Sequence, residues 1–311
     1  MAAETDNVMA CPKFAANVSL MFLEYDKLAL RYKKAAEAGF KAVECVNPFE
    51  TPLEELVEAK SNSGLKQVHI NCFAGDNDEK GFAAVPGKEK EFHESLLKSI
   101  EYAKGLDCSK IHIMSGKINE DTSIGTMKQT YLKNLRDASK ILEKRNEKNS
   151  FFSMNLSAIN NGCSMSASSA NFQTDFTLLT YFQENIIGLI EPVNEHTIFN
   201  YYMNDFKLAE EIVKAVHSPN MRLQLDVFHL QIICGNMTRN IQRLLPLVGH
   251  IQVSQAPNRD ELDAPGEINY PYIFKLFNKF GYNDYIGLEY KPSGPSTEKS
   301  LSWIKKFGYS L

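Results

Sequence analysis

The chain has 311 residues, of which 43% are apolar and 23% are charged, and its formal net charge at pH 7 is −4. This is an ordinary globular composition, and the length suits one α/β barrel with a full hydrophobic core. A net charge this small provides no strong attraction to nucleic acid or to anionic lipid. We therefore expect neither a nucleic-acid partner nor a membrane partner.

The cysteines and the N-terminus indicate the compartment. The six cysteines contain no CxxC pair, and several lie in or beside apolar runs, which is typical of buried thiols in a reducing compartment. Residues 1–13 form a polar tail without the apolar core of a secretory signal. No window approaches the ~18 apolar residues of a membrane span. We expect a cytoplasmic protein, although a matrix location stays open.

Short apolar runs alternate along the chain with longer segments of helical periodicity. The runs are rich in Val, Ile, Leu or Phe, as expected of strands buried on both faces. They cover residues 14–20, 41–46, 66–73, 110–116, 186–194, 222–230, 250–256 and 285–290. Between them, 88–105 is a clear amphipathic segment, with apolar residues three or four apart. Several such segments end at a glycine, including Gly64 and Gly105, where a helix C-cap is expected.

Eight strands that alternate with helices predict parallel βα units. Eight units can close on themselves, so we expect an α/β fold, a single-domain (β/α)8 TIM barrel, over residues 14–311. An open doubly wound sheet is the alternative. That fold usually has a glycine-rich phosphate turn after an early strand, which this sequence lacks. We accordingly expect no nucleotide cofactor.

Two segments interrupt the alternation. The connection 74–87 is long for a βα turn, and such loops build the functional sites of barrels. The segment at about 148–183 is rich in Ser and Asn and has no steady period, so we interpret it as an insertion after the fourth helix.

Polar side chains interrupt the ends of the four later strands. They are Glu191, Asp226, Gln252 and Glu289, one on each strand. A buried carboxylate costs several kcal/mol unless it is paired or bound to a cation. Taken singly, each residue is equally well explained by a structural hydrogen bond. Together, they are explained by one divalent cation at the barrel mouth, and an all-oxygen set of ligands favours Mg²⁺ or Mn²⁺.

Other residues are candidates for contact with a substrate. His229 follows Asp226 by three residues and is expected to face a ligand held by the metal. Arg259, just after the seventh run, is suited to pair with a substrate carboxylate through two N–H groups. A structural histidine and an exposed loop arginine are the alternatives. Secondary candidates within earlier strands are Asn17, Glu44, His69, Asn71 and His112.

On these residues the sequence resembles the hydroxypyruvate isomerase family, within the xylose isomerase-like barrels. The matching stretches cover nearly all of the chain outside the first dozen residues and the insertion. They are FAANVS, GFKAVE, AGDNDEKGFAAVPGKEKEF, KIHIMSGK, LIEPVN, LQLDVFHLQ, GHIQVSQAPNR, PGEINYPYIF and GLEYKP. The long third loop and the PGEIN segment are the most specific of them.

The resemblance implies conversion of hydroxypyruvate to tartronate semialdehyde by proton transfer through an enediolate. It implies Glu191 and Glu289 as the catalytic pair. Of the secondary candidates, Asn71 and His112 are expected to contact the substrate. The implied metal ligands are Glu191, Asp226, Gln252 and Glu289. The third ligand is often histidine in the wider superfamily, so Gln252 disfavours tightly bound Zn²⁺, and the need for a metal stays open. The implied partner is a small hydroxy-keto acid, and a homo-oligomer is compatible with the resemblance.

Three other functions compete with this one. The substrate of an isomerase or epimerase could be another small hydroxy-keto acid or a ketose. A phosphodiester hydrolase of the abasic-site endonuclease kind uses the same barrel, but it needs several histidine ligands for zinc and a basic face. A non-catalytic binding protein on this fold is supported only by the insertion.

Overall fold

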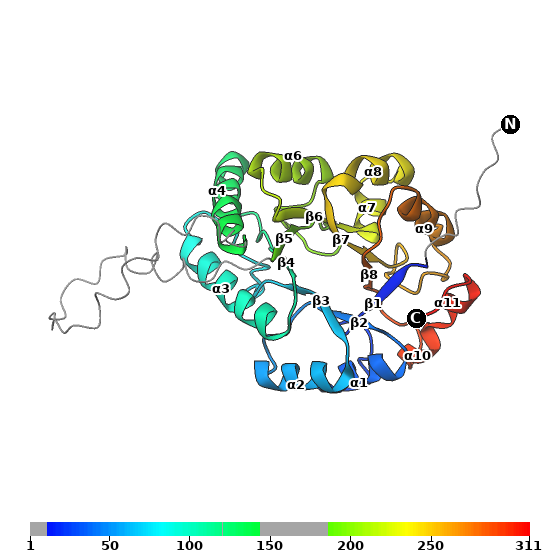
Figure 1. The fold of residues 1–311 in the computed structure, drawn as a ribbon. Coiled ribbons are helices and arrows are strands. Elements are labelled where there is room, and N and C mark those ends of the chain that lie inside the picture. The colour runs from blue at the N-terminus through cyan, green and yellow to red at the C-terminus, as the bar shows by residue number, and fades with distance from the viewer. Residues whose placement is uncertain (1–10, 120, 144–185) are drawn as a thin grey trace, which may run out of the picture.

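The computed structural model describes residues 11–119, 121–143 and 186–311. Its eight parallel strands close into a barrel in the order β1 to β8, and the helices form a ring around them (Figure 1). The predicted α/β class and (β/α)8 TIM barrel are confirmed. Residues 1–10 of the expected tail and the expected insertion at about 148–183 lie outside the described residues, so the domain boundaries stay predictions.

The strands are short and almost fully buried. Their bounds are β1 (Lys13–Asn17), β2 (Ala42–Cys45), β3 (Lys66–Asn71), β4 (Lys110–His112), β5 (Ile187–Ile190), β6 (Met221–Asp226), β7 (Val248–Val253) and β8 (Tyr285–Leu288). The barrel closes between β1 and β8, where Ala16 is the register partner of Leu288. Because all the strands are parallel, the residues that follow them gather at one mouth of the barrel.

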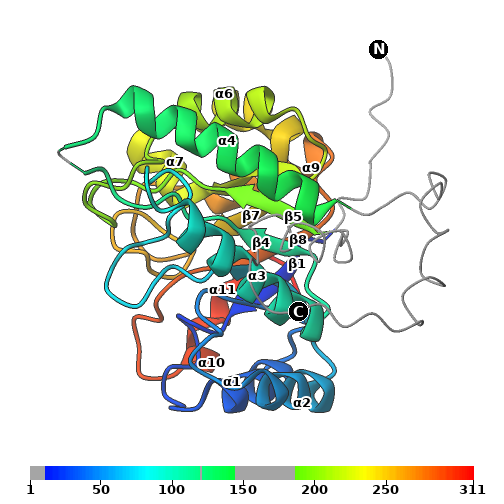
Figure 2. The same ribbon diagram turned by 90° about the vertical axis from the view of Figure 1, so that its left-hand side faces the viewer.

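The helices cover the outside of the barrel. Their bounds are α1 (Leu28–Glu37), α2 (Leu53–Ser63), α3 (Glu89–Gly105), α4 (Ile124–Leu142), α6 (Phe206–Val216), α7 (Val227–Ile233), α8 (Met237–Leu244), η2 (Leu245–Leu247), α9 (Tyr270–Lys279), α10 (Thr297–Ser300) and α11 (Ser302–Lys306). Figure 2 shows α4 and α6 on one side of the strands and α1 and α2 on the opposite side. No described helix is both long and apolar enough to cross a bilayer.

The predicted helix 88–105 is confirmed as α3, although its glycine is not the cap. Gly64 ends α2 in the left-handed region, with φ 67°, as expected. Gly105 is the last helical residue of α3, and the C-cap is Leu106, whose N–H donates to the Tyr102 carbonyl oxygen. The glycine rule therefore predicts the end of α2 correctly and places the cap of α3 one residue too early.

The predicted strand 222–230 is wrong beyond Asp226. Asp226 ends β6 and is the N-cap of α7, and its Oδ1 accepts a hydrogen bond of 2.9 Å from the Phe228 N–H. The run is apolar throughout, and hydrophobicity alone does not separate a buried strand from a buried helix. The signal that could have marked the boundary is the aspartate, a preferred N-cap residue. As a result, His229 lies on the first turn of α7 instead of on a strand.

The C-terminal helix is anchored to the first strand by an aromatic contact. Trp303 of α11 is fully buried, and its ring packs edge-to-face on Phe14 of β1, with the centroids 5.3 Å apart. Aromatic pairs of this geometry add to the stabilisation that comes from burial. Trp303 thus joins the end of the chain to its beginning at the closure of the barrel.

Replacing Trp303 with alanine should lower the free energy of unfolding by ~3–5 kcal/mol, because it opens a cavity under α11. Urea denaturation followed by circular dichroism measures this. The control is Phe199→Ala, at a side chain that is 68% exposed, which should change stability by less than ~0.5 kcal/mol. Equal effects of the two substitutions would contradict the anchoring role of Trp303.

Candidate active site

Three carboxylates predicted from the sequence converge at the mouth of the barrel. Glu191 directly follows β5, Asp226 ends β6 and Glu289 directly follows β8. All three side chains are buried, with residue exposures of 5%, 0% and 8%. Glu191 and Glu289 line one cleft of about 560 Å³, and Asp226 is buried next to it. The strand ends therefore bring together residues that are almost a hundred positions apart.

Arg259 bridges two of these carboxylates. Its Nη2 donates to Asp226 Oδ2 at 3.1 Å and to Glu289 Oε2 at 2.5 Å, and its Nε donates to the Glu289 carbonyl oxygen at 3.2 Å. Among its bonds to described residues, none uses Nη1. Arg259 lines the cleft, so the predicted contact between its remaining N–H groups and a substrate carboxylate stays a prediction.

The three carboxylates carry more negative charge than their direct cationic partner balances. In the described part of the chain, Arg259 is the one Lys or Arg side chain that forms an ion pair with any of them. Burial raises the pKa of Glu191 well above its ordinary value, and Glu289 and Asp226 raise it further. Burial raises the pKa of Glu289 to about 8 and that of Asp226 to about 6, although Arg259 opposes both shifts. The cluster therefore favours protons or an added cation.

The residues fit a divalent cation. Glu191 Oε1 is buried and has no hydrogen-bond partner among the described residues. Glu191 and Asp226 each have a carboxylate oxygen within 4.8 Å of the other and of a ring nitrogen of His229. Once deprotonated, the three carboxylates beside Arg259 carry two uncompensated negative charges, which match a divalent cation, and the carboxylate donors suit Mg²⁺ or Mn²⁺. The free oxygen of Glu191 is the clearest sign, because buried carboxylate oxygens usually have partners.

Gln252 lies below the cleft, where the protein already bonds its amide. Its Oε1 accepts from Gln224 Nε2 at 2.6 Å, and its Nε2 donates to Glu44 Oε1 at 2.7 Å. Gln252 is the register partner of Asp226, so it belongs to the same layer of side chains. Its oxygen has a second lone pair, and its role as a metal ligand stays a prediction.

The four predicted substrate-contact residues all line the cleft. They are Asn71, His112, His229 and Arg259. His112 Nδ1 lies 3.2 Å from Glu191 Oε2, and burial lowers the pKa of this histidine to about 3. Burial also lowers the pKa of His229 well below its ordinary value. The two imidazoles are therefore neutral near pH 7 and can serve as hydrogen-bond donors without adding charge.

The tautomer of His229 follows from its neighbours. The backbone N–H of Asn194 donates to His229 Nδ1 at 3.2 Å, and Asn194 Nδ2 lies 2.7 Å from the same atom. A neutral imidazole that accepts at Nδ1 carries its proton on Nε2, and this atom lies 3.5 Å from Asp226 Oδ2. His229 thus presents an N–H group at the edge of the carboxylate cluster.

Sequence reasoning missed Gln224, which donates to Glu191 Oε2 at 2.9 Å. A signal was present, because Gln224 and Asp226 are two residues apart on β6 and so point to the same side of the strand. The bonding partners of Asn17 and Glu44, which were only secondary candidates, place both residues under the same cluster.

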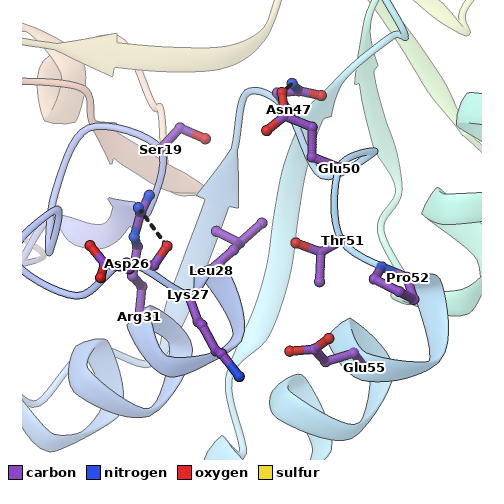
Figure 3. Close-up of a pocket in the computed structure, with 10 residues that line it drawn as sticks. All are labelled: Ser19, Asp26, Lys27, Leu28, Arg31, Asn47, Glu50, Thr51, Pro52 and Glu55. Atoms are coloured by element: carbon purple, nitrogen blue, oxygen red, sulfur yellow. Dashed lines mark hydrogen bonds between the residues drawn. The ribbon is translucent and has the colours of Figure 1, made fainter.

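A second hollow of about 490 Å³ lies between the starts of α1 and α2, and it shares Asn47 and Glu50 with the cleft. Figure 3 shows Arg31 on one side of it and Glu55 on the other. Arg31 donates to the carbonyl oxygens of Tyr25 and Val18, at 2.8 and 3.0 Å. Its guanidinium thus stabilises the loop after β1. Because this arginine has a structural role, the carboxylate cluster remains the candidate site.

Comparison with known proteins identifies the family of the chain. A model of the xylose isomerase-like TIM barrel family matches residues 32–307. The chain is 31% identical to a hydroxypyruvate isomerase of Escherichia coli, over 95% of this chain and 99% of the relative. It is 35% identical to a 2-oxo-tetronate isomerase of Haemophilus influenzae, with the same coverage.

A solved structure is also similar over nearly the whole chain. It is named as an AP endonuclease, family 2, from Brucella melitensis, and it is 32% identical, covers 95% of this chain and 98% of its own, and has a TM-score of 0.78. The family model and the two curated relatives each span far more than half of the chain. The chain therefore belongs to the hydroxypyruvate isomerase family of xylose isomerase-like TIM barrels, and it is an isomerase.

Proposed function

We propose that the protein interconverts hydroxypyruvate and tartronate semialdehyde (2-hydroxy-3-oxopropanoate). The observation that carries the proposal is that two buried glutamates, Glu191 and Glu289, line one cleft together with a guanidinium and two neutral histidines. Two carboxyl groups that face one substrate can divide the roles of acid and base between them. The relatives named hydroxypyruvate isomerase and 2-oxo-tetronate isomerase support a small hydroxy-keto acid as the substrate.

Glu289 is the better candidate for the base. Arg259 donates to its Oε2 and opposes the rise of its pKa, so of the two glutamates Glu289 more readily takes the ionised form that can remove a proton from C3 of hydroxypyruvate. Glu191 has no such cationic partner in the described part of the chain, and its pKa is raised further, so it is suited to deliver a proton to C2. The C3 hydrogen is thus replaced by a C2 hydrogen, the hydroxyl proton moves from O3 to O2, and no redox cofactor is needed.

The remaining residues of the cleft position the substrate. Arg259 Nη1 is suited to the substrate carboxylate, and the Nε2–H of His229 to one of its oxygens. His112 and Asn71 border the same space. Glu191, Asp226, Gln252 and Glu289 would hold the divalent cation, which when bound stabilises negative charge on the substrate oxygens. The cysteine pattern supports a cytoplasmic location as part of the proposal.

A nuclease fits the chemistry of this site less well, despite the name of the similar solved structure. A zinc-cluster phosphodiester hydrolase needs several histidine ligands and a basic surface for DNA. The metal-ligand candidates at this mouth include one histidine, His229, and the net charge is −4. Ketose epimerisation would use the same glutamates, and assays with ketoses beside hydroxy-keto acids distinguish it.

Glu289→Gln should lower kcat for hydroxypyruvate by ~10²-fold or more, because the amide cannot accept the C3 proton. Proton NMR in deuterated water measures both turnover and exchange at carbon. The control is Glu261→Gln, at a glutamate of similar burial that accepts from Ser293 instead. If Glu289→Gln retained turnover within a few-fold of wild type, the catalytic role of Glu289 would be wrong.

Mn²⁺ should raise the melting temperature of the wild-type protein, because a ligand that binds only the folded state stabilises it, by ~2.7 kcal/mol at a hundred times its Kd. Asp226→Asn should abolish most of this shift, since it removes one of the carboxylates of the cluster. Differential scanning fluorimetry at several Mn²⁺ concentrations provides the comparison. A shift of equal size in Asp226→Asn would place the cation elsewhere and leave the isomerase proposal standing.

A further inference from the structure

We propose that Asn17 and Gln224 are positioning residues that hold the two glutamates in register through one continuous hydrogen-bonded chain inside the barrel. The proposal rests on the proposed function, in which Glu191 and Glu289 transfer the protons. The chain of side chains runs Glu191, Gln224, Gln252, Glu44, Asn17 and Glu289. It passes under the cleft from the end of β5 to the end of β8.

Next to each glutamate, the chain has an amide that uses both of its N–H groups. Gln224 Nε2 donates to Glu191 Oε2 at 2.9 Å and to Gln252 Oε1 at 2.6 Å. Asn17 Nδ2 donates to Glu289 Oε1 at 3.3 Å and to Glu44 Oε1 at 2.9 Å. A side-chain amide has only two N–H donors, so both donors of each amide are committed, one to a glutamate of the site and the other to the core.

The direction of every bond in the chain follows from its carboxylates. A carboxylate oxygen accepts hydrogen bonds, and the amide nitrogen of Gln252 faces Glu44 Oε1 at 2.7 Å. The oxygen of Gln252 then faces Gln224, and the nitrogen of Gln224 must lie between that oxygen and Glu191. The four inner members are at most 1% exposed, so bulk water cannot replace a lost partner.

The barrel provides space and an anchor for Glu44, the centre of the chain. A Cβ on Gly287 of β8 would lie 2.1 Å from Glu44 Oε2, so the glycine makes room for this carboxylate. His250 Nε2 lies 2.7 Å from the same oxygen. Strand pairing adds to this order, because Asn17 is the register partner of Glu44 and Gln252 that of Gly287.

The chain also determines which carboxylate oxygens remain available. Gln224 occupies Oε2 of Glu191, which leaves Oε1 without a partner in the described part of the chain. Asn17 occupies Oε1 of Glu289, and Arg259 occupies Oε2. A purely structural pair of core amides has no reason to end on the two glutamates that line the cleft, whereas positioning residues do.

The test compares Gln224→Met with Gln67→Met. Gln67 of β3 is also buried in the barrel wall and is bonded to Tyr32 and to the His69 carbonyl, not to a glutamate. We expect Gln224→Met to lower kcat for hydroxypyruvate and Mn²⁺ affinity by ~10–100-fold, as is usual when the support of metal ligands is removed. Gln67→Met should leave both within three-fold, although both variants lose thermal stability.

The outcomes separate the two proposals. If the wild-type protein isomerises hydroxypyruvate and Gln224→Met matches Gln67→Met in kcat and Mn²⁺ affinity at equal folded fraction, the positioning role is wrong. If the wild-type protein does not isomerise hydroxypyruvate, the proposed function is wrong, and this inference falls with it. Isothermal titration calorimetry gives the Mn²⁺ affinities independently of turnover.

A double substitution tests the continuity of the chain. Because Asn17 and Gln224 are linked through Gln252 and Glu44, the losses in kcat from Asn17→Leu and Gln224→Met should multiply to more than the loss in the double variant. If the loss in kcat of the double variant equalled the product of the two single losses, the two amides would act independently and the continuous chain would be contradicted.

Discussion

The burial of Asp226 and Glu289 against the guanidinium of Arg259 is the interaction on which the candidate site depends. Carboxylates that are taken out of water need a cation or a proton, and one guanidinium does not satisfy three of them. Arg259 therefore keeps part of the cluster ionised, while Glu191 retains a raised pKa and an oxygen without a partner in the described chain. This imbalance makes the site suited both to proton transfer and to a divalent cation.

The barrel makes this arrangement possible. Backbone register between neighbouring parallel strands holds Asp226 beside Gln252, and Gln252 beside Gly287. The relative positions of these residues therefore do not depend on flexible loops. The apolar residues on the outer faces of the same strands pack against the helices and supply the stability. The interior of the barrel can then contain buried polar groups that would otherwise lower the stability of the fold.

That interior is unusually polar for a barrel, whose centre is mostly filled by branched aliphatic side chains. Glu44, His250 and His69 lie fully buried in it, with the rings of His69 and His250 stacked at 4.9 Å. A buried carboxylate is tolerated when it finds partners, and Glu44 has three: His250, Gln252 and Asn17. The polar core and the site at the mouth are therefore parts of one network.

The sequence by itself determined the barrel and the positions of the polar residues at its strand ends, because burial on both faces produces apolar runs that a polar residue visibly interrupts. Tertiary structure alone decided the partners. Arg259 forms ion pairs with Asp226 and Glu289. Gln252 accepts a hydrogen bond from Gln224 and donates one to Glu44. Gln224 links Glu191 to this buried network. These choices depend on strand register and on the space that Gly287 leaves for Glu44, which are distances between segments far apart in sequence. Periodicity is a local property and contains no such distances.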